Sequence, residues 1–256
     1  MIIGISPGEY QKNRSFLNKR LRLTRLIFIL SLFLPVIVFL IFYSGTLESK
    51  KTFTKAEADN IFKPVARVET PSGMGTAFLV GETTLLTARH VVDDLEIGDH
   101  VSLFFDKAPE LPVCEAEIRW YDPVTPGEDS YLLTDIAVLR LVDDHIIPSD
   151  FPRLKLGESY LMEVTDEVMI IGYPQGDFAA TEGTISNNEV HGLDMFKLDV
   201  ESYQGHSGGP LVSQEDQNTI GILIAGMTGD FQGINFALKI DNVLEMLYNE
   251  GISLNE

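Results

Sequence analysis

Gly205-His206-Ser207-Gly208-Gly209-Pro210 is the stretch of sequence that decides the fold. A serine hydroxyl is a weak nucleophile, so an enzyme that uses it needs a base beside it and backbone N–H groups directed at the developing oxyanion. Glycines around a serine allow the tight turn that directs those groups. The motif predicts Ser207 as a nucleophile and the Gly205 and Ser207 amides as its oxyanion hole. On this motif alone, an ordinary glycine-rich turn between strands is the alternative.

Two motifs earlier in the chain supply partners for such a serine. In Thr87-Ala88-Arg89-His90 a histidine follows the end of an apolar run, and a neutral imidazole can take the serine proton. Asp135 opens the apolar run Ile136–Leu141, where a carboxylate can hold the imidazole in the required tautomer. Each residue alone has a structural alternative. Together, the order His90, Asp135, Ser207 is that of the chymotrypsin type.

The body of the chain reads as a series of short strands. From Pro64 onward, short runs rich in Val, Ile, Phe and Thr alternate with Gly, Pro, Asp and Asn, a pattern typical of a sandwich or barrel. An acidic, proline-containing break, Asp143–Pro152, divides the series in two. The expected strands are Val65–Glu69, Gly75–Val80, Thr83–Thr87, Val101–Phe105, Cys114–Trp120, Ile136–Leu141, Glu167–Gly172, Ala180–Ser186, Met195–Val200, Pro210–Ser213, Thr219–Met227 and Gly233–Leu238.

Together with the chymotrypsin-type order of His90, Asp135 and Ser207, these runs predict an all-β fold of two six-stranded antiparallel β-barrels. The first barrel is expected at about residues 63–150 and the second at about 151–240, within a domain covering 63–250. One helix, Ile240–Asn249, is expected at the end because apolar residues recur there at helical spacing, with Asp241 as its N-cap. His90 and Asp135 then belong to the first barrel and Ser207 to the second, so the site is expected in the cleft between them.

The N-terminal region predicts a membrane anchor. Leu26–Leu47 is a run of 22 residues without a charge, and a helix of that length reaches about 33 Å, enough for a bilayer core of about 30 Å. Residues 1–25 form a basic head that is expected in the cytoplasm. Residues 48–62 are expected to be a tether, with a short helix near Ala56–Phe62. The domain that follows is expected outside the cytoplasm. A cleaved signal peptide is the alternative, but its apolar region is normally shorter.

Charge separates the head from the body and excludes one class of partner. The chain carries 19 Lys+Arg and 38 Asp+Glu, a formal net charge of −19, but residues 1–43 hold six basic residues and one acidic residue. The remainder has a net charge of −24. So acidic a body argues against binding nucleic acid. The single cysteine, Cys114, excludes an internal disulfide, and no Cys/His cluster has the spacing of a metal site.

Taken together, these motifs resemble the trypsin-like serine proteases, and most closely their HtrA/Deg branch. The matching segments are Gly75-Thr76-Ala77-Phe78-Leu79-Val80, Thr87–Val92, Asp135–Leu139, Val168–Pro174, Gly183–Ser186, Gly205–Leu211 and Gly233–Leu238. The resemblance implies a chymotrypsin-like fold and endopeptidase activity on unfolded or exposed polypeptide segments, without a cofactor. It also implies a periplasmic location, a role in extracytoplasmic quality control or signalling, and homo-oligomers, which occur in the branch.

The sequence departs from the branch in three places. It ends soon after the last helix, so a regulatory PDZ domain is not expected. His206 replaces the usual Asn or Asp before the serine, which raises the hypothesis of a pH-sensitive loop. The substrate pocket is expected to involve Glu201, Ser202 and Gln204. A buried carboxylate at Glu201 would favour Lys or Arg at the cleaved position, whereas the branch accepts small apolar side chains.

The sequence thus predicts a single-pass, membrane-anchored serine endopeptidase. Two alternatives stay open. One is a catalytically inactive chymotrypsin-fold module that binds partners. The other is a protease that is latent until a partner or oligomer orders the Gly205–Ser207 segment.

Overall fold

The computed structural model describes residues 53–122, 134–190, 192–226 and 234–254, together with residues 31 and 33–35. The predicted cytoplasmic head and nearly all of the Leu26–Leu47 run lie outside the described residues. Of that run only Ser31 and Phe33–Pro35 are described, and they are helical. None of the helices within the described ranges has the length and apolar character needed to cross a bilayer.

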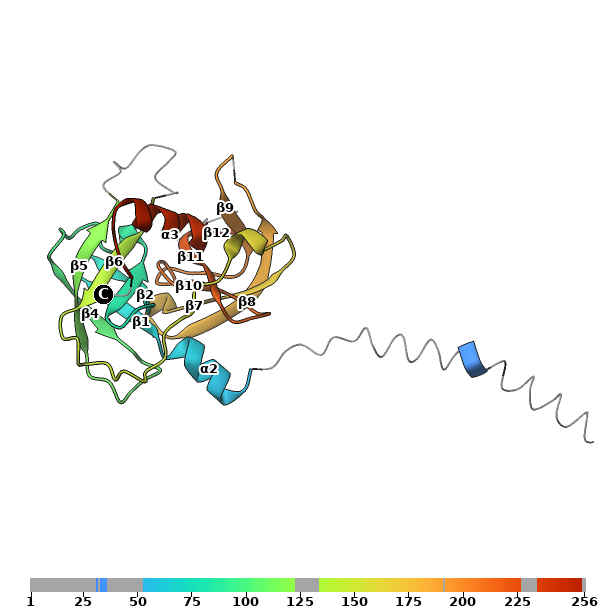
Figure 1. The fold of residues 1–256 in the computed structure, drawn as a ribbon, viewed down its shortest axis with the longest axis horizontal. Coiled ribbons are helices and arrows are strands. Elements are labelled where there is room, and N and C mark those ends of the chain that lie inside the picture. The colour runs from blue at the N-terminus through green and yellow to red at the C-terminus, as the bar shows by residue number, and fades with distance from the viewer. Residues whose placement is uncertain are drawn as a thin grey trace, which may run out of the picture. The chain divides into compact units, whose positions relative to one another are not determined.

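The body contains two closed barrels of six antiparallel strands, as the sequence predicts (Figure 1). The first has the strand order β1-β2-β3-β6-β5-β4 and the second the equivalent order β7-β8-β9-β12-β11-β10. The first consists of β1 Val65–Thr70, β2 Gly73–Leu79, β3 Thr84–Thr87, β4 His100–Phe104, β5 Cys114–Tyr121 and β6 Ala137–Leu141. The second consists of β7 Glu167–Gly172, β8 Ala179–Asn187, β9 Met195–Asp199, β10 Pro210–Ser213, β11 Thr219–Gly226 and β12 Ile234–Lys239. The barrels thus repeat one topology, although no repeat is evident in the sequence.

The strand β7 shows how the two barrels pack together. Its side chains alternate between two faces, as in any strand. Val168 and Ile170 belong to a cluster of buried apolar residues inside the second barrel. Met169 and Ile171 instead join the large core cluster that includes the interior of the first barrel. Both faces of β7 are therefore buried, which explains why its sequence is continuously apolar rather than alternating.

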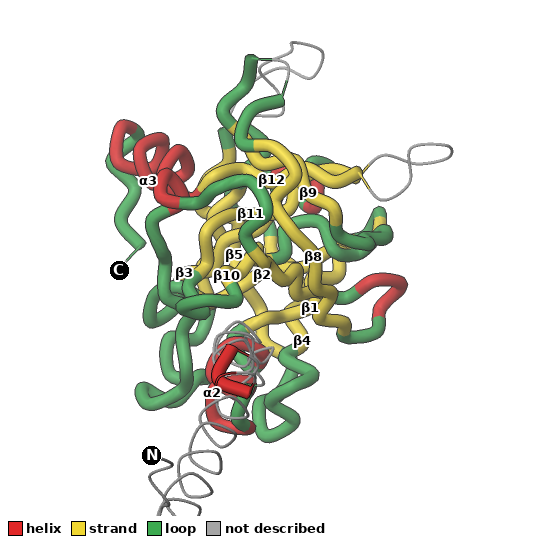
Figure 2. Tube along the Cα trace, turned by 90° about the vertical axis from the view of Figure 1, so that its right-hand side faces the viewer, coloured by secondary structure: helices red, strands yellow, loops and turns green. Residues whose placement is uncertain are grey.

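Two helices flank the barrels, at opposite ends of the body (Figure 2). Helix α2, Lys55–Phe62, begins at Thr54, whose side chain and that of Glu57 form a capping box. Helix α3, Ile240–Asn249, has the bounds that the apolar spacing predicts and packs on β11 and β12. The predicted N-cap of α3 is wrong. Lys239 occupies that position without a side-chain cap, and the Asp241 carboxylate instead accepts hydrogen bonds from Ser159 Oγ and Tyr160 N.

The connection between β6 and β7 is bound to both barrels. Leu154 N donates to Leu79 O of the first barrel at 3.0 Å, and Thr219 N of the second donates to Lys155 O at 2.7 Å. The Arg153 guanidinium donates to several backbone carbonyls, including Gly81 O at 3.2 Å and Ser149 O at 3.2 Å. The connection therefore fixes the spacing of the barrels, on which any site between them depends.

Candidate active site

His90 and Asp135 are brought together by the pairing of β3 with β6. The register places Thr87 opposite Ala137, so the residues just after β3 lie beside those just before β6. His90 is in a short 3-10 helix, Arg89–Val91, directly after β3. Asp135 Oδ1 accepts from His90 N at 2.9 Å, and Oδ2 lies 2.6 Å from His90 Nδ1. This second contact holds the proton on Nδ1 and leaves Nε2 as a proton acceptor.

The environment of this pair makes His90 a stronger base. Asp135 is only 1% exposed, so its charge is poorly screened by water. Burial lowers the pKa of His90, but the hydrogen bond and charge of Asp135, with a smaller contribution from the charge of Asp93, outweigh burial and raise the pKa above its usual value. A histidine whose basicity is raised in this way is well matched to accepting the serine proton as a general base.

Ser207 comes from the second barrel, and its backbone lies against the first. Residues 203–209, here called the Ser207 loop, precede β10. Thr76 N on β2 donates to Ser207 O at 2.8 Å. A Cβ added to Gly208 would lie 2.7 Å from Ala88 N, two residues before His90. The Ser207 loop therefore lies next to the segment that carries His90, at the junction of the two barrels.

In the Ser207 loop, hydrogen bonds hold the backbone carbonyls of residues 204 to 207. The pairs are Gln204 O with Gln175 N at 2.9 Å, Gly205 O with Thr76 Oγ1 at 2.6 Å, His206 O with Gly209 N at 2.8 Å and Ser207 O with Thr76 N at 2.8 Å. A trans peptide unit is planar, so fixing a carbonyl also fixes the opposite direction of the next N–H. The orientation of every peptide unit in this segment is therefore determined.

The amides of residues 205–209 in this loop divide into two groups. Those that donate are His206 N to Tyr203 O at 3.0 Å, Gly208 N to Leu223 O at 2.8 Å and Gly209 N to His206 O at 2.8 Å. The Gly205 and Ser207 amides donate to no acceptor among the described residues. These are the two amides that the sequence predicts as the oxyanion hole. The carbonyls of the same two peptide units, Gln204 O and His206 O, are held by hydrogen bonds, so the directions of the two N–H groups are fixed. Because neither N–H group donates to an acceptor among the described residues, both are available to an anionic ligand.

A substitution at Gly208 tests how closely this loop packs against the first barrel. Its φ is +80°, and a Cβ there would lie 2.3 Å from Thr76 O and 2.3 Å from Thr87 Oγ1. Gly208→Ala is expected to lower the free energy of unfolding by about 3 kcal/mol or more, because both backbone strain and overlap with fixed atoms oppose it. Urea unfolding measures the change. Gly98→Ala is the control: its φ is +97° in open space, and we expect a loss of only about 1–2 kcal/mol. Equal losses would contradict the packing described here.

The three residues predicted for the substrate pocket have different environments. Glu201 is exposed, so the buried carboxylate required for a preference for Lys or Arg is absent, and that premise is wrong. The Ser202 hydroxyl donates to Oδ1 of Asn235, whose Nδ2 donates to Val200 O. The Gln204 side chain is exposed, and its backbone carbonyl accepts a hydrogen bond from Gln175 N. Asn235, only 2% exposed, was not among the predicted residues.

His206 is a buried side chain in the Ser207 loop. It is 1% exposed, and its Nδ1 accepts from Tyr203 N at 3.1 Å. Its Nε2 has no hydrogen-bond partner within the described residues. Burial lowers the pKa of His206 to about 4, so the side chain is neutral at pH 7. A proton on Nδ1 would displace the Tyr203 N–H.

This burial predicts a loss of stability in acid. The His206 pKa is about 4 in the folded protein, against 6.5 as its ordinary value, so the unfolded chain binds more protons between these limits. The His206 contribution is complete above pH 6.5, falls as the pH falls toward 4, and then stays constant. His206→Asn is expected to reduce the loss of unfolding free energy between pH 7.5 and 5 by about 2 kcal/mol. Urea unfolding at both pH values measures it.

His145→Asn is the matched control for that experiment, since the His145 side chain is 91% exposed. We expect it to keep the pH dependence of the unchanged protein. A His206→Asn variant with the full acid-induced loss would contradict the buried, neutral state of His206.

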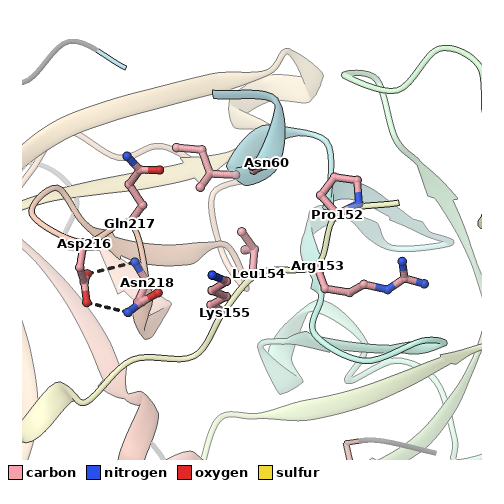
Figure 3. Close-up of a pocket in the computed structure, with 9 residues that line it drawn as sticks. Asn60, Pro152, Arg153, Leu154, Lys155, Asp216, Gln217 and Asn218 are labelled. Atoms are coloured by element: carbon pink, nitrogen blue, oxygen red, sulfur yellow. Dashed lines mark hydrogen bonds between the residues drawn. The ribbon is translucent and has the colours of Figure 1, made fainter. Parts of the chain in front are cut away.

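A cavity of about 300 Å³ is lined by a different set of residues (Figure 3). It is bounded by α2, the connection between the barrels and the turn between β10 and β11. Its lining residues are Asn60, Ile61, Pro152, Arg153, Leu154, Lys155, Asp216, Gln217 and Asn218. None of the residues predicted for catalysis or substrate binding is among them. The candidate active site is therefore distinct from this cavity.

The fold and this arrangement agree with a family match. The chain belongs to the family described as the trypsin-like peptidase domain, whose model matches residues 75–222. The resemblance to the HtrA branch of serine endopeptidases is confirmed by relatives and by solved structures. A probable periplasmic serine endoprotease, DegP-like, from Pseudomonas savastanoi pv. phaseolicola is 31% identical over 183 residues, which are 68% of this chain and 34% of the relative.

Two solved structures share the fold. The HtrA-type protease AlgW with a tripeptide is 25% identical, with a TM-score of 0.60 over 78% of this chain and 65% of that one. The Rv3671c protease of M. tuberculosis H37Rv, in its inactive form, is 21% identical, with a TM-score of 0.57 over 78% of this chain and 98% of that one. The second likeness supports the fold alone. The chain spans about a third of the length of the curated relatives it matches.

Proposed function

We propose that this chain is a serine endopeptidase in which Ser207, His90 and Asp135 form the catalytic triad. The proposal rests on the position of the Ser207 loop beside the segment that holds the hydrogen-bonded His90–Asp135 pair. In that loop the Gly205 and Ser207 N–H groups donate to no acceptor among the described residues. A base beside the hydroxyl and a preorganised pair of amides are the two requirements of acyl transfer to serine. Both lie at the junction of the barrels.

The proposed reaction proceeds through an acyl-enzyme. Ser207 Oγ attacks the carbonyl carbon of the scissile peptide as its proton passes to His90 Nε2. The carbonyl oxygen becomes an oxyanion, which the Gly205 and Ser207 amides stabilise. The proton on Nε2 then moves to the leaving amine as the C–N bond breaks. Water attacks the resulting ester by the same route, which releases the acid and restores Ser207. Asp135 stays ionised and stabilises the transient imidazolium.

Labelling with a fluorophosphonate tests this proposal directly. The reagent phosphonylates a serine only where the hydroxyl is activated by a base. We expect the full-length chain to be labelled and Ser207→Ala to be unlabelled. Ser186→Ala, which changes an exposed serine on β8, is the control and should be labelled like the unchanged protein. A full-length chain that resists labelling would instead support the inactive binding module.

For substrates, we propose unfolded or exposed segments of polypeptides. The resemblance to the HtrA branch supports this class, and the exposure of Glu201 favours small apolar side chains over Lys or Arg at the cleaved position. Peptide series that vary only the residue before the cleaved bond test this preference. Faster turnover after Lys or Arg than after Val or Ala would contradict it. Assembly into a homo-oligomer is part of the same proposal and can be tested by light scattering.

For location, we propose a single-pass membrane protein whose domain lies outside the cytoplasm, in the periplasm. The uncharged run Leu26–Leu47 and the basic residues before it support this topology. The periplasmic relatives agree with it. The full-length chain should stay with membranes during carbonate extraction, and protease added to intact spheroplasts should digest the domain. Release by carbonate would contradict the anchor.

A further inference from the structure

Thr76, a residue of the first barrel, makes two hydrogen bonds to the Ser207 loop. It lies on β2 and is completely buried. Its amide donates to Ser207 O at 2.8 Å, and its hydroxyl donates to Gly205 O at 2.6 Å. Thr76 therefore holds two carbonyls of the loop, one through its backbone and the other through its side chain.

The same hydroxyl also holds a second segment. Thr76 Oγ1 accepts from Tyr173 N at 3.1 Å, at the start of the turn 173–176. That turn supplies Gln175 N, which donates to Gln204 O at 2.9 Å. Gln175 has a φ of +54°, a conformation that non-glycine residues seldom adopt. The hydroxyl thus joins the Ser207 loop to the turn that fixes the carbonyl before Gly205.

These contacts determine where the Gly205 amide points. The Gly205 N–H and the Gln204 carbonyl belong to one planar peptide unit and point in opposite directions. Gln175 N holds that carbonyl from one side, and Thr76 Oγ1 holds the next carbonyl along the chain. Gly205, with a φ of +105°, could otherwise rotate freely because glycine has no Cβ. Without the Thr76 hydroxyl, the Gly205 carbonyl loses its hydrogen bond. The peptide unit that bears the Gly205 N–H is then held only by the hydrogen bond from Gln175 N to Gln204 O.

We propose that Thr76 is a positioning residue for the oxyanion hole, acting through the Gly205 carbonyl and the 173–176 turn. The inference rests on the proposed function, since it concerns the same site. Thr76 is completely buried and contacts the Ser207 loop, so replacing its side chain should affect the stabilisation of the oxyanion and leave the base unchanged. The effect should therefore appear in kcat and not in KM or in the pH profile.

Thr76→Val and Thr76→Ala remove the hydroxyl, and Thr76→Ser keeps it. With the full-length chain in detergent micelles and a fluorogenic unfolded casein, we expect kcat to fall about 10²-fold in the first two variants, the range for loss of one oxyanion donor. KM should stay within about threefold of the starting value. Thr76→Ser should retain kcat within about fivefold of the starting value. If the shape of the threonine side chain mattered rather than its hydroxyl, kcat would fall in this variant too.

Thr219→Val is the matched control, because Thr219 is also fully buried and its hydroxyl has no hydrogen-bond partner among the described residues. We expect its kcat to be unchanged. A second readout is a peptide aldehyde, which forms a tetrahedral adduct with an oxyanion. Its affinity should fall about 10²-fold in Thr76→Ala, and the pH at which kcat/KM reaches half its maximum should not move.

The outcomes separate this inference from the proposed function. If the unchanged protein neither cleaves casein nor reacts with a fluorophosphonate, the proposed function fails. If the unchanged protein is active and Thr76→Ala keeps kcat within about threefold, the positioning role is wrong while the triad stands. If kcat falls as far in Thr76→Ser as in Thr76→Ala, the positioning role of the hydroxyl is also wrong, because a variant that keeps the hydroxyl would lose the same activity. Thr76→Ala supplies the result if the bulkier Thr76→Val does not fold.

Discussion

Replacing Ser207 by alanine, or His90 by alanine, is expected to lower kcat by about 10⁶-fold. The serine supplies the attacking oxygen, and the histidine supplies the base that takes its proton, so either change removes the same covalent step. The residual rate should come from the Gly205 and Ser207 amides, which stay in place because the backbone carbonyls of residues 204 to 207 keep their hydrogen bonds. Cleavage of a fluorogenic unfolded casein by purified full-length variants measures the loss.

The double variant sharpens this first test. Residues that act as one unit are not additive, so the combination of both changes should reduce kcat no further than either change alone. His100→Ala, which removes an exposed histidine at the start of β4, is the control and should keep full activity. A double variant about 10⁶-fold slower than each single variant would show that the two residues do not act in one step.

Replacing Asp135 by asparagine is expected to lower kcat by about 10⁴-fold. The amide cannot hold the His90 proton on Nδ1 in the required tautomer, although its size preserves the packing of a residue that is 1% exposed. The change also removes the main interaction that raises the His90 pKa and leaves the burial that lowers it. The acidic limb of kcat/KM against pH should therefore lie above pH 6.5 in the unchanged protein and move to lower pH in Asp135→Asn.

Asp93→Asn provides the comparison for the pH profile. The charge of Asp93 contributes least to the His90 pKa, and no hydrogen bond to His90 accompanies it. We expect a small movement of the acidic limb in the same direction, with kcat largely retained. An Asp135→Asn variant whose acidic limb does not move would contradict the electrostatic coupling between Asp135 and His90.

The strands, helix α3 and the pairing of His90 with Asp135 could be predicted because their signals are local in sequence. Strand runs bounded by Gly, Pro and Asp placed all twelve strands within two residues at either end, and the recurrence of Ile240, Val243 and Leu247 gave the bounds of α3. The pairing of His90 with Asp135 followed from two strand ends and the order of the three motifs. Each of these features can be read without knowing which strands are neighbours.

The missed features depend on contacts between distant segments. Thr76 lies in a motif that the resemblance singles out, but its role comes from Gly205, 129 positions along the chain. Asn235 reaches Ser202 across 33 positions. The error at Asp241 has the same origin, because Ser159 competes for its carboxylate. A hydrogen bond across such distances leaves no periodic pattern, so propensity and spacing cannot reveal it.

The order of the strands also has a consequence for how the chain matures. Each barrel closes on itself from one contiguous stretch, with β1–β6 between Val65 and Leu141 and β7–β12 between Glu167 and Lys239. During synthesis, the chain passes through an intermediate in which all six strands of the first barrel are present and none of the second. That intermediate carries the base but not the proposed nucleophile. Until the second barrel has formed and docked, a newborn chain therefore cannot bring Ser207 beside the His90–Asp135 pair.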